Sequence, residues 1–378
     1  MLSARSPATF SVMSRWVASM CLALALVGCA SGHPPAPRPM LTYLGQSQVP
    51  FDATFDGTVI GGLSALSYDP GRQLYYVISD DRSKKNPARF YTVQLSLSDR
   101  GIDHVTFTGT HPLLDPSGRP FPPLRADTTP PIVPPDPEGI AFDPSRQRLY
   151  WSSEGERLTA GPVLLDPWIR TAALDGAYLG QFTLPANLAM SAQRVGPRRD
   201  KALEGLALTP DGRSLFAAME DPGYNDGPLS DGGHRILTRI TKFDVATGAA
   251  TAQYAYPMEP PAPPADVNGV SDLVALSDTT FLVIERSSAL PPTVRIYRAE
   301  IGAATDVLTT PSMEHAAVTP MTKTLAVDLS STPGLSPLDN VEGITLGPKL
   351  PDGRQSVVLV SDNNFSPRQV TQFLLLAM

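Results

Sequence analysis

The sequence predicts an all-β fold, a β-propeller built from four-stranded antiparallel blades, and two observations carry this prediction. First, 40 prolines and 29 glycines separate short runs rich in Val, Leu, Ile, Tyr, Phe and Thr, and almost no stretch shows helical periodicity. Second, one hairpin pattern recurs along the chain at a nearly constant spacing. A fixed period is typical of repeat architectures, and four strands per unit is what a propeller blade contains.

The repeated hairpin is clearest at residues 136–154. An acid and a glycine, Glu138-Gly139, open a short apolar run, a turn containing Pro144 reverses it, and a second apolar run ends on Glu154. The residues at the opening position of the five copies are Ser64, Glu138, Glu204, Asp272 and Glu342. Consecutive opening residues lie 74, 66, 68 and 70 positions apart, which indicates five units of similar length.

Further strand candidates follow each hairpin, such as residues 90–97 and 105–110 in the first unit. The last unit supplies only a third strand, at 369–376. Residues 41–48 could provide its fourth strand, so that the N- and C-terminal strands close the ring and leave no open sheet edge. We therefore expect five blades, with a sixth, degenerate blade within 297–328 as the alternative.

The N-terminus reads as a targeting segment. Residues 16–27 are apolar or small, and Leu26-Val27-Gly28-Cys29 has the form of a bacterial lipobox. The predicted organisation is a lipoprotein signal peptide at 1–28, a lipidated Cys29 and proline-rich tether at 29–40, and a propeller at 41–378. An ordinary signal peptide with a stray cysteine is the alternative. Ser31 stands where Asp would retain a lipoprotein in the inner membrane, so we expect an outer-membrane anchor facing the periplasm.

Composition excludes several classes of function. Cys21 leaves with the signal and Cys29 carries lipid, so the mature chain has neither a disulfide nor a thiol nucleophile. Without residues 1–28, 28 basic residues face 37 acidic ones, and a net charge of −9 disfavours nucleic acid as a partner. The membrane is expected to be reached through the lipid anchor only. The five histidines are too scattered for a metal site or a serine triad.

The two ends of each hairpin are expected to meet at one end of the channel, because the first strand of a blade lines the channel and the second pairs beside it. The expected neighbours are Ser64 with Asp80, Glu138 with Glu154, Glu204 with Glu220, Asp272 with Glu285, and Glu342 with Asp362. Carboxylates packed this closely raise one another's pKa or share a cation. Oxygen-rich surroundings select Ca²⁺ first and Mg²⁺ second. The alternative is that these acids cap turns and face solvent.

The position of each residue in this acidic ring predicts its role. The expected metal ligands are Asp80, Glu138, Glu204, Asp272, Glu342 and Asp362. The expected catalytic carboxylates are Glu154, Glu220 and Glu285. The expected substrate-binding residues are Ser64, Arg82, Arg286, Asn363 and Asn364. The two arginines could instead pair with neighbouring carboxylates, and the two asparagines could serve a turn.

These segments resemble the phytase-like propeller family, often labelled "esterase-like activity of phytase". The segments that carry the resemblance are Gly61-Gly62-Leu63-Ser64, Ser79-Asp80-Asp81-Arg82, Pro137-Glu138-Gly139-Ile140, Glu204-Gly205-Leu206, Ile284-Glu285-Arg286, Val341-Glu342-Gly343-Ile344 and Val360-Ser361-Asp362-Asn363-Asn364-Phe365. The resemblance covers roughly residues 41–378. It implies a secreted β-propeller that hydrolyses phosphoric or carboxylic esters. A more distant likeness connects the acid–glycine step with calcium-dependent lactonase and gluconolactonase propellers.

The sequence thus favours a secreted, lipid-anchored, divalent-cation-dependent hydrolase that acts on a small-molecule ester or phosphoester at the channel mouth. The acidic balance makes highly phosphorylated phytate a less suitable substrate. A noncatalytic cell-envelope propeller that binds a ligand or a protein and holds a structural cation is the alternative.

Overall fold

Short runs of β-branched and aromatic residues, interrupted by proline and glycine, form strands throughout the chain. The computed structural model describes residues 40–378 apart from 160–162, 230–235, 262 and 266. In this part of the chain the helices are two 3₁₀ turns, Ala186–Leu188 and Leu329–Ser331. None of its helices has the length and apolar character needed to cross a bilayer. The predicted signal peptide and the lipidated Cys29 lie outside the described residues.

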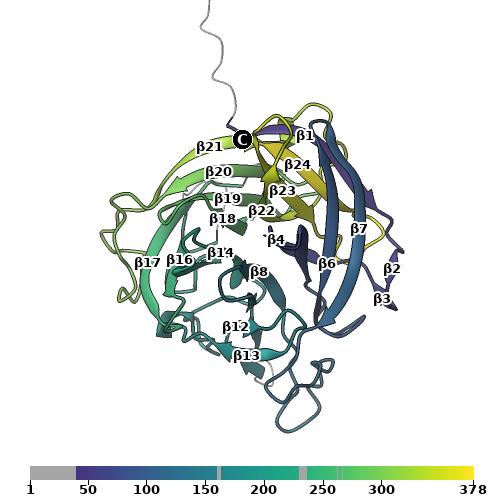
Figure 1. Cartoon of the computed structure of the whole chain (residues 1–378). Coiled ribbons are helices and arrows are strands. Elements are labelled where there is room, and N and C mark those ends of the chain that lie inside the picture. The colour runs from purple at the N-terminus through teal and green to yellow at the C-terminus, as the bar shows by residue number, and fades with distance from the viewer. Residues whose placement is uncertain (1–39, 160–162, 230–235, 262, 266) are drawn as a thin grey trace, which may run out of the picture. The chain divides into compact units, whose positions relative to one another are not determined.

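Five four-stranded antiparallel sheets form the blades (Figure 1). Blade one contains β4 (Leu63–Asp69), β5 (Leu74–Ser79), β6 (Arg89–Ser98) and β7 (Gly101–Pro112). Blade two contains β8 (Pro137–Asp143), β9 (Arg148–Ser153), β12 (Trp168–Ala172) and β13 (Tyr178–Gln181). Blade three contains β14 (Leu203–Leu208), β15 (Ser214–Met219), β16 (Ile236–Asp244) and β17 (Ala250–Met258). Blade four contains β18 (Asn268–Ala275), β19 (Thr280–Ser287), β20 (Val294–Glu300) and β21 (Thr322–Asp328).

Blade five joins the two ends of the described chain. It contains β22 (Val341–Lys349), β23 (Gln355–Ser361), β24 (Thr371–Ala377) and the N-terminal strand β1 (Thr42–Val49). Strand β1 pairs antiparallel with β24, from Thr42 opposite Ala377 to Val49 opposite Thr371. The predicted closure by the terminal strands is therefore confirmed. Two small hairpins complete the set, β2 (Thr54–Phe55) with β3 (Thr58–Val59) and β10 (Glu156–Leu158) with β11 (Val163–Leu165).

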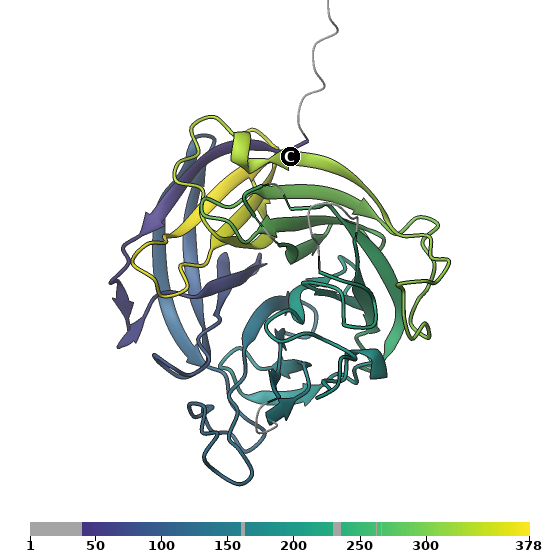
Figure 2. The same cartoon turned by 180° about the vertical axis from the view of Figure 1, so that it is seen from behind.

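The inner strands of the blades form a closed ring. Strands β4, β8, β14, β18 and β22 contact one another in this order, and β22 contacts β4 again. Figures 1 and 2 show these strands around the centre and the fourth strands at the periphery. Five blades, as predicted, complete the circle. The alternative sixth blade is wrong, because residues 294–300 and 322–328 are the third and fourth strands of blade four.

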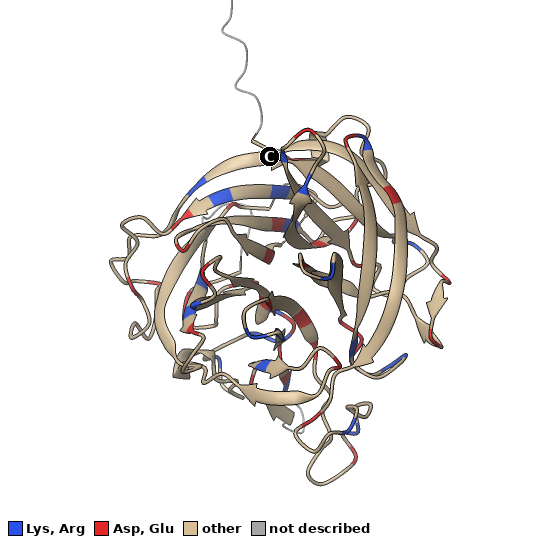
Figure 3. Cartoon of the chain, viewed as in Figure 1, with Lys and Arg blue, Asp and Glu red and all other residues tan. Residues whose placement is uncertain are grey.

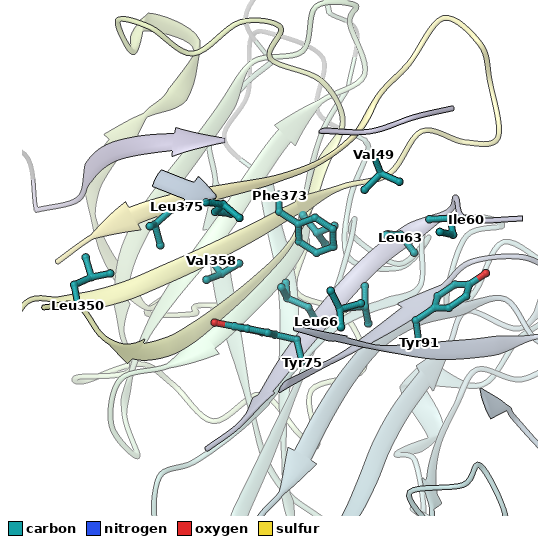
Figure 4. Close-up of a cluster of buried hydrophobic side chains, with 14 of the residues drawn as sticks. Val49, Ile60, Leu63, Leu66, Tyr75, Tyr91, Leu350, Val358, Phe373 and Leu375 are labelled. Atoms are coloured by element: carbon teal, nitrogen blue, oxygen red, sulfur yellow. The ribbon is translucent and has the colours of Figure 1, made fainter. Parts of the chain in front are cut away.

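A separate hydrophobic cluster holds each pair of neighbouring blades together. Figure 4 shows the cluster between blades five and one, where Phe373 and Val358 pack with Leu66 and Tyr75. The alternating strand pattern places one set of apolar side chains against each neighbour, so every blade is buried on both faces. The clusters thereby fix the distance between neighbouring blades. In this way they also define the channel that the blades enclose.

A β-bulge interrupts the inner strand of every blade near its start. The pairing with the second strand shifts between Leu63 and Ala65 in blade one, and equivalent shifts occur in the other four blades. In a bulge an unpaired residue is left out of the ladder and its side chain is re-aimed. The bulged residues include Ser64, Glu138, Glu204 and Glu342, which are opening residues of the predicted repeat.

Glycine follows the bulged acid in three blades because the next inner strand passes too close for a side chain. A Cβ on Gly139 would lie 2.5 Å from the carbonyl oxygen of Glu204. One on Gly205 would lie 2.5 Å from Cα of Asp272, and one on Gly343 would lie 2.8 Å from Cα of Ala65. These distances are below van der Waals contact with backbone atoms that cannot swing away. In these three blades the close approach of the next inner strand thus requires the glycine.

Replacement of Gly205 by alanine is expected to destabilise the propeller. Overpacking against backbone of this kind costs about 1–3 kcal/mol of unfolding free energy. Urea denaturation of Gly205→Ala measures the loss, with Gly180→Ala as the matched control, since a Cβ on Gly180 meets nothing within 4 Å. Equal stability changes in the two variants would contradict the assignment of Gly205 to close strand approach.

Candidate functional site

The bulged acids converge on a pocket at one end of the inner-strand ring. The cavity has a volume of about 470 Å³. Its lining residues are Asp80, Asp81, Arg82, Lys84, Lys85, Asp136, Glu138, Glu154, Asp200, Lys201, Glu204, Glu220, Arg286, Glu342, Asp362, Asn364 and Phe365. Ten carboxylates therefore face five basic side chains in one pocket. Figure 3 shows acidic and basic residues on the strands and loops near the centre of the ring.

The structure brings together several of the acids that the hairpin geometry predicted as neighbours. Carboxylate oxygens of Asp136, Glu138 and Glu154 lie within 4.8 Å of one another, and so do those of Glu154, Glu204 and Glu220. Glu154 belongs to both groups, so the ends of blades two and three meet there. In blade five, the amide of Asn340 donates to Glu342 at 2.9 Å and to Asp362 at 3.5 Å.

Burial and mutual repulsion raise the pKa values of these acids. Burial, followed by the charges of Glu204, Asp136 and other acids, raises the pKa of Glu138 well above its ordinary value. Burial raises the pKa of Asp136 to about 7, although the nearby Arg82 opposes this rise. The pKa values of Asp80, Glu154, Glu204 and Asp362 are raised well above the ordinary range for the same first reason, burial. The pocket therefore strongly favours protons or a bound cation.

Three basic side chains neutralise part of the negative charge of the acidic ring. Arg286 contacts Glu342 at 3.1 Å and Glu220 at 3.9 Å. Lys201 contacts Glu220 at 2.7 Å. Arg82 contacts Asp136 at 3.2 Å, and it also pairs with Glu156 at 2.6 Å and Asp200 at 3.2 Å. The protein's own basic side chains thus compensate part of the acidic charge.

Five lining carboxylates have no ion pair with any described residue, namely Asp80, Glu138, Glu154, Glu204 and Asp362. Oδ1 of Asp80 is buried and has no hydrogen-bond partner among the described residues. An unsatisfied buried carboxylate oxygen is costly, so a protonated neighbour or a cation is expected beside it. The donor set contains oxygen and no sulfur or histidine, which fits a hard cation such as Ca²⁺ or Mg²⁺.

The predicted register of blade four is wrong by one residue. Val270 pairs with Glu285, and the bulge falls at Ser271, so Ser271 and Arg286 occupy the positions that Asp272 and Glu285 were predicted to hold. Because side chains alternate between the faces of a strand, a shift of one residue turns them away from the expected face. An arginine therefore stands in the ring where the other four blades have an acid.

Asp272 and Glu285 do not line the pocket. The carboxylate of Asp272 accepts hydrogen bonds from the backbone N–H groups of Leu273 and Ile344, each at 2.8 Å, and so connects the inner strands of blades four and five. Glu285 accepts hydrogen bonds from Tyr256 at 2.8 Å and Asn268 at 2.9 Å, and it pairs with Lys323. Both acids serve the packing between blades.

Some of the predicted substrate-binding residues line the pocket, and the others make contacts between blades. Arg82, Arg286 and Asn364 line the pocket. Ser64 is buried and donates a hydrogen bond to the carbonyl of Glu138 at 3.0 Å. Asn363 is 1% exposed, and its side-chain oxygen accepts from the N–H of Gly62 at 3.2 Å. Ser64 and Asn363 thus connect blade one with its neighbours.

Sequence reasoning missed seven lining residues, namely Asp81, Lys84, Lys85, Asp136, Asp200, Lys201 and Phe365. Asp136 lies two residues before Glu138, and Asn340 has the same place before Glu342, so a polar residue at this position was an available signal. Lys201 has no counterpart in the other repeats and arrives from the long loop before β14. It lies beside Glu220 because the pairing of β14 with β15 continues one residue beyond the strands, where the N–H of Glu220 donates to the carbonyl of Ala202.

Comparison with solved structures gives only distant likenesses. Hydrazine synthase from Kuenenia stuttgartiensis is 12% identical over 82% of this chain and 81% of its own, with a TM-score of 0.37. A gluconolactonase from Xanthomonas campestris is 9% identical over 92% and 99%, with a TM-score of 0.34. A periplasmic gluconolactonase from Pseudomonas aeruginosa is 12% identical over 89% and 95%, with a TM-score of 0.36.

Comparison with known sequences gives one clear result. No curated protein matches the chain. The family model "Phytase-like: Esterase-like activity of phytase" matches residues 58–365, which include all the lining residues of the pocket.

The raised pKa values predict an unusual pH dependence for the chelator-treated protein. Asp136 and Asp221 both have a pKa of about 7 in the folded state, chiefly through burial, against roughly 4 for an unfolded aspartate. The folded protein keeps protons on these two groups that the unfolded chain loses, so their contribution to the unfolding free energy is fully present below about pH 4 and is lost as pH rises through about 7. The melting temperature in chelator is expected to fall between pH 5 and pH 8. A rise over this interval would contradict the charge assignment.

Proposed function

Because the chain belongs to the phytase-like family described as esterase-like activity of phytase, we propose that it is a divalent-cation-dependent hydrolase of a phosphoric or carboxylic ester. Family membership supports a hydrolase-type propeller that acts on small molecules. The observation that carries the proposal is the group of buried and half-buried pocket carboxylates that lack an ion pair among the described residues. Such a group is costly to keep unless it serves a bound cation or proton transfer.

The cation site in this proposal is formed by Asp136, Glu138 and Glu154. Their oxygens are close enough to share one ion, and Glu138 and Glu154 have no ion-pair partner among the described residues. The unpartnered Oδ1 of Asp80 is a further candidate donor from blade one. Ca²⁺ is the first choice and Mg²⁺ the second, because all these donors are carboxylate oxygens. Glu204, Glu342 and Asp362 add negative charge around the site.

The cation would polarise the ester oxygen and supply charge stabilisation as the bond to the attacking oxygen forms. Glu220 is the candidate general base, since it belongs to the second acid group and its charge is balanced by Lys201 and Arg286. Water attacks the carbonyl carbon or the phosphorus, and Glu220 accepts its proton. The bond to the alcohol oxygen then breaks, and the proton passes to the leaving alcohol.

Calcium removal and return tests the proposal. After treatment with a chelator, the melting temperature of the protein is expected to fall, and its turnover of a panel of aryl esters, aryl phosphates and lactones is expected to be lost. Addition of Ca²⁺ should restore both. Glu138→Gln and Glu154→Gln should abolish the thermal response to Ca²⁺ and reduce kcat/KM by roughly a hundredfold or more. The matched control is Asp272→Asn, an acid outside the pocket, which should keep the calcium response.

Two outcomes would reject parts of this proposal. If Ca²⁺ raises the melting temperature and no substrate on the panel is turned over, the chain is a binding propeller with a structural cation. If neither Ca²⁺ nor Mg²⁺ changes stability or activity, the cation site itself is absent.

We also propose that the propeller works in the cell envelope, anchored by lipid on Cys29. The proposal is supported by the lipobox at residues 26–29 and the proline-rich tether that follows it. Cys29→Ala is expected to move the protein from the membrane fraction to the soluble fraction. Equal membrane association of the two forms would reject the anchor, and Cys21→Ala is the matched control.

A further inference from the structure

One apolar side chain lines a pocket that is otherwise polar. Of the 17 described lining residues, 16 are charged or carry an amide, and the remaining one is Phe365. Its side chain is partly exposed. An aromatic ring contributes nothing to the binding of a cation by carboxylates or to proton transfer by them, so its presence in this pocket needs a separate explanation.

Phe365 is held in a backbone conformation that disfavours it. Asn364 has a φ of 47° and Phe365 a φ of 50°, both in the left-handed region. Asparagine tolerates this region, whereas a bulky residue rarely adopts it. Strained residues of this kind gather at functional sites, where the surrounding structure enforces them.

The enforcing contacts come from the two residues before the strained pair. The side-chain oxygen of Asn363 accepts a hydrogen bond from the N–H of Phe365 at 3.0 Å, and that of Asp362 accepts from the N–H of Asn364 at 2.7 Å. Asn363 also accepts from the N–H of Gly62 at 3.2 Å, which ties the turn to blade one. These hydrogen bonds hold the backbone turn that carries Phe365.

Two glycines form the surface on which the ring rests. A Cβ on Gly61 would lie 2.9 Å from Cδ1 of Phe365, and one on Gly62 would lie 2.7 Å from Cε2. A side chain at either position would push the ring from its place. The ring therefore rests against bare backbone, and Phe365 also lines the pocket.

We propose that Phe365 is the specificity-determining residue that receives an apolar part of the substrate, so that the substrate class is esters or phosphoesters carrying an aryl or compact alkyl group. This inference rests on the proposed function. A substrate that is polar on all sides, such as a polyphosphorylated polyol, gains nothing from the ring. The left-handed backbone alone would be adopted with less strain by asparagine or glycine, so the aromatic side chain itself needs an explanation.

The test compares phenylphosphonate with methylphosphonate, two non-hydrolysable probes that differ only in the apolar group, in ligand-observed NMR titrations with Ca²⁺ present. The wild-type protein is expected to bind phenylphosphonate about fivefold to tenfold more tightly. Phe365→Asn is expected to reduce this preference to about one and to leave the affinity for methylphosphonate unchanged within roughly twofold. Phe365→Tyr keeps the ring and should keep the preference. Phe51→Ala, which removes an exposed phenylalanine outside the pocket, is the matched control.

Melting temperatures separate specificity from structure. Because asparagine suits the left-handed conformation, Phe365→Asn should melt no lower than the wild type. Equal binding of the two probes by the wild type, no binding of either probe, or parallel loss of both in Phe365→Asn would overturn the inference. A large drop in melting temperature would do the same. The binding measurement needs no turnover, so an inactive protein that prefers phenylphosphonate through Phe365 refutes only the hydrolase, and an active protein without this preference refutes only the specificity residue.

Discussion

Five inner strands must pass close to one another around a narrow axis, and the rest of the structure depends on this constraint. Each inner strand bulges near its start, and in three blades the residue after the bulged acid is a glycine that the next backbone almost touches. The bulge also removes one residue from the ladder and re-aims its side chain. The same local geometry therefore closes the ring and delivers acids to the pocket.

The acids that the bulges place in the pocket concentrate negative charge there. Ten carboxylates share a cavity of about 470 Å³, and burial and repulsion raise the pKa values of many of them. Arg82, Lys201 and Arg286 compensate only part of the charge. Stability alone would favour fewer acids, because buried unpaired charge is destabilising. The arrangement fits a site at which a cation and an ester meet, and the single aromatic side chain at its edge fits a substrate with an apolar group.

Much of the fold could be predicted from the sequence because each blade repeats one local pattern. The hairpins at Glu138 and Glu204 have the same length, and the alternation of apolar residues fixes their pairing. The blade count and the closure by β1 followed from counting strands. The predicted register of blade four was wrong because Asp272 and Glu285 were aligned with the acids of the other repeats by residue type. The bulge actually falls at Ser271. Residue type could not reveal a shift of one position that leaves an arginine in an acidic ring.

The sequence by itself determined the repeat, the fold class and four of the five blades' contributions to the acid ring, since these depend on spacing and periodicity within single hairpins. Only the tertiary structure decided which charges meet. The contacts of Arg82 with Asp136 and Glu156 join loops of blades one and two, and no local pattern encodes them. The place of Phe365 likewise depends on its contact with Gly61 and Gly62, far away in sequence. Local propensity fixes strands and turns, whereas pairings across the ring arise only when the blades close.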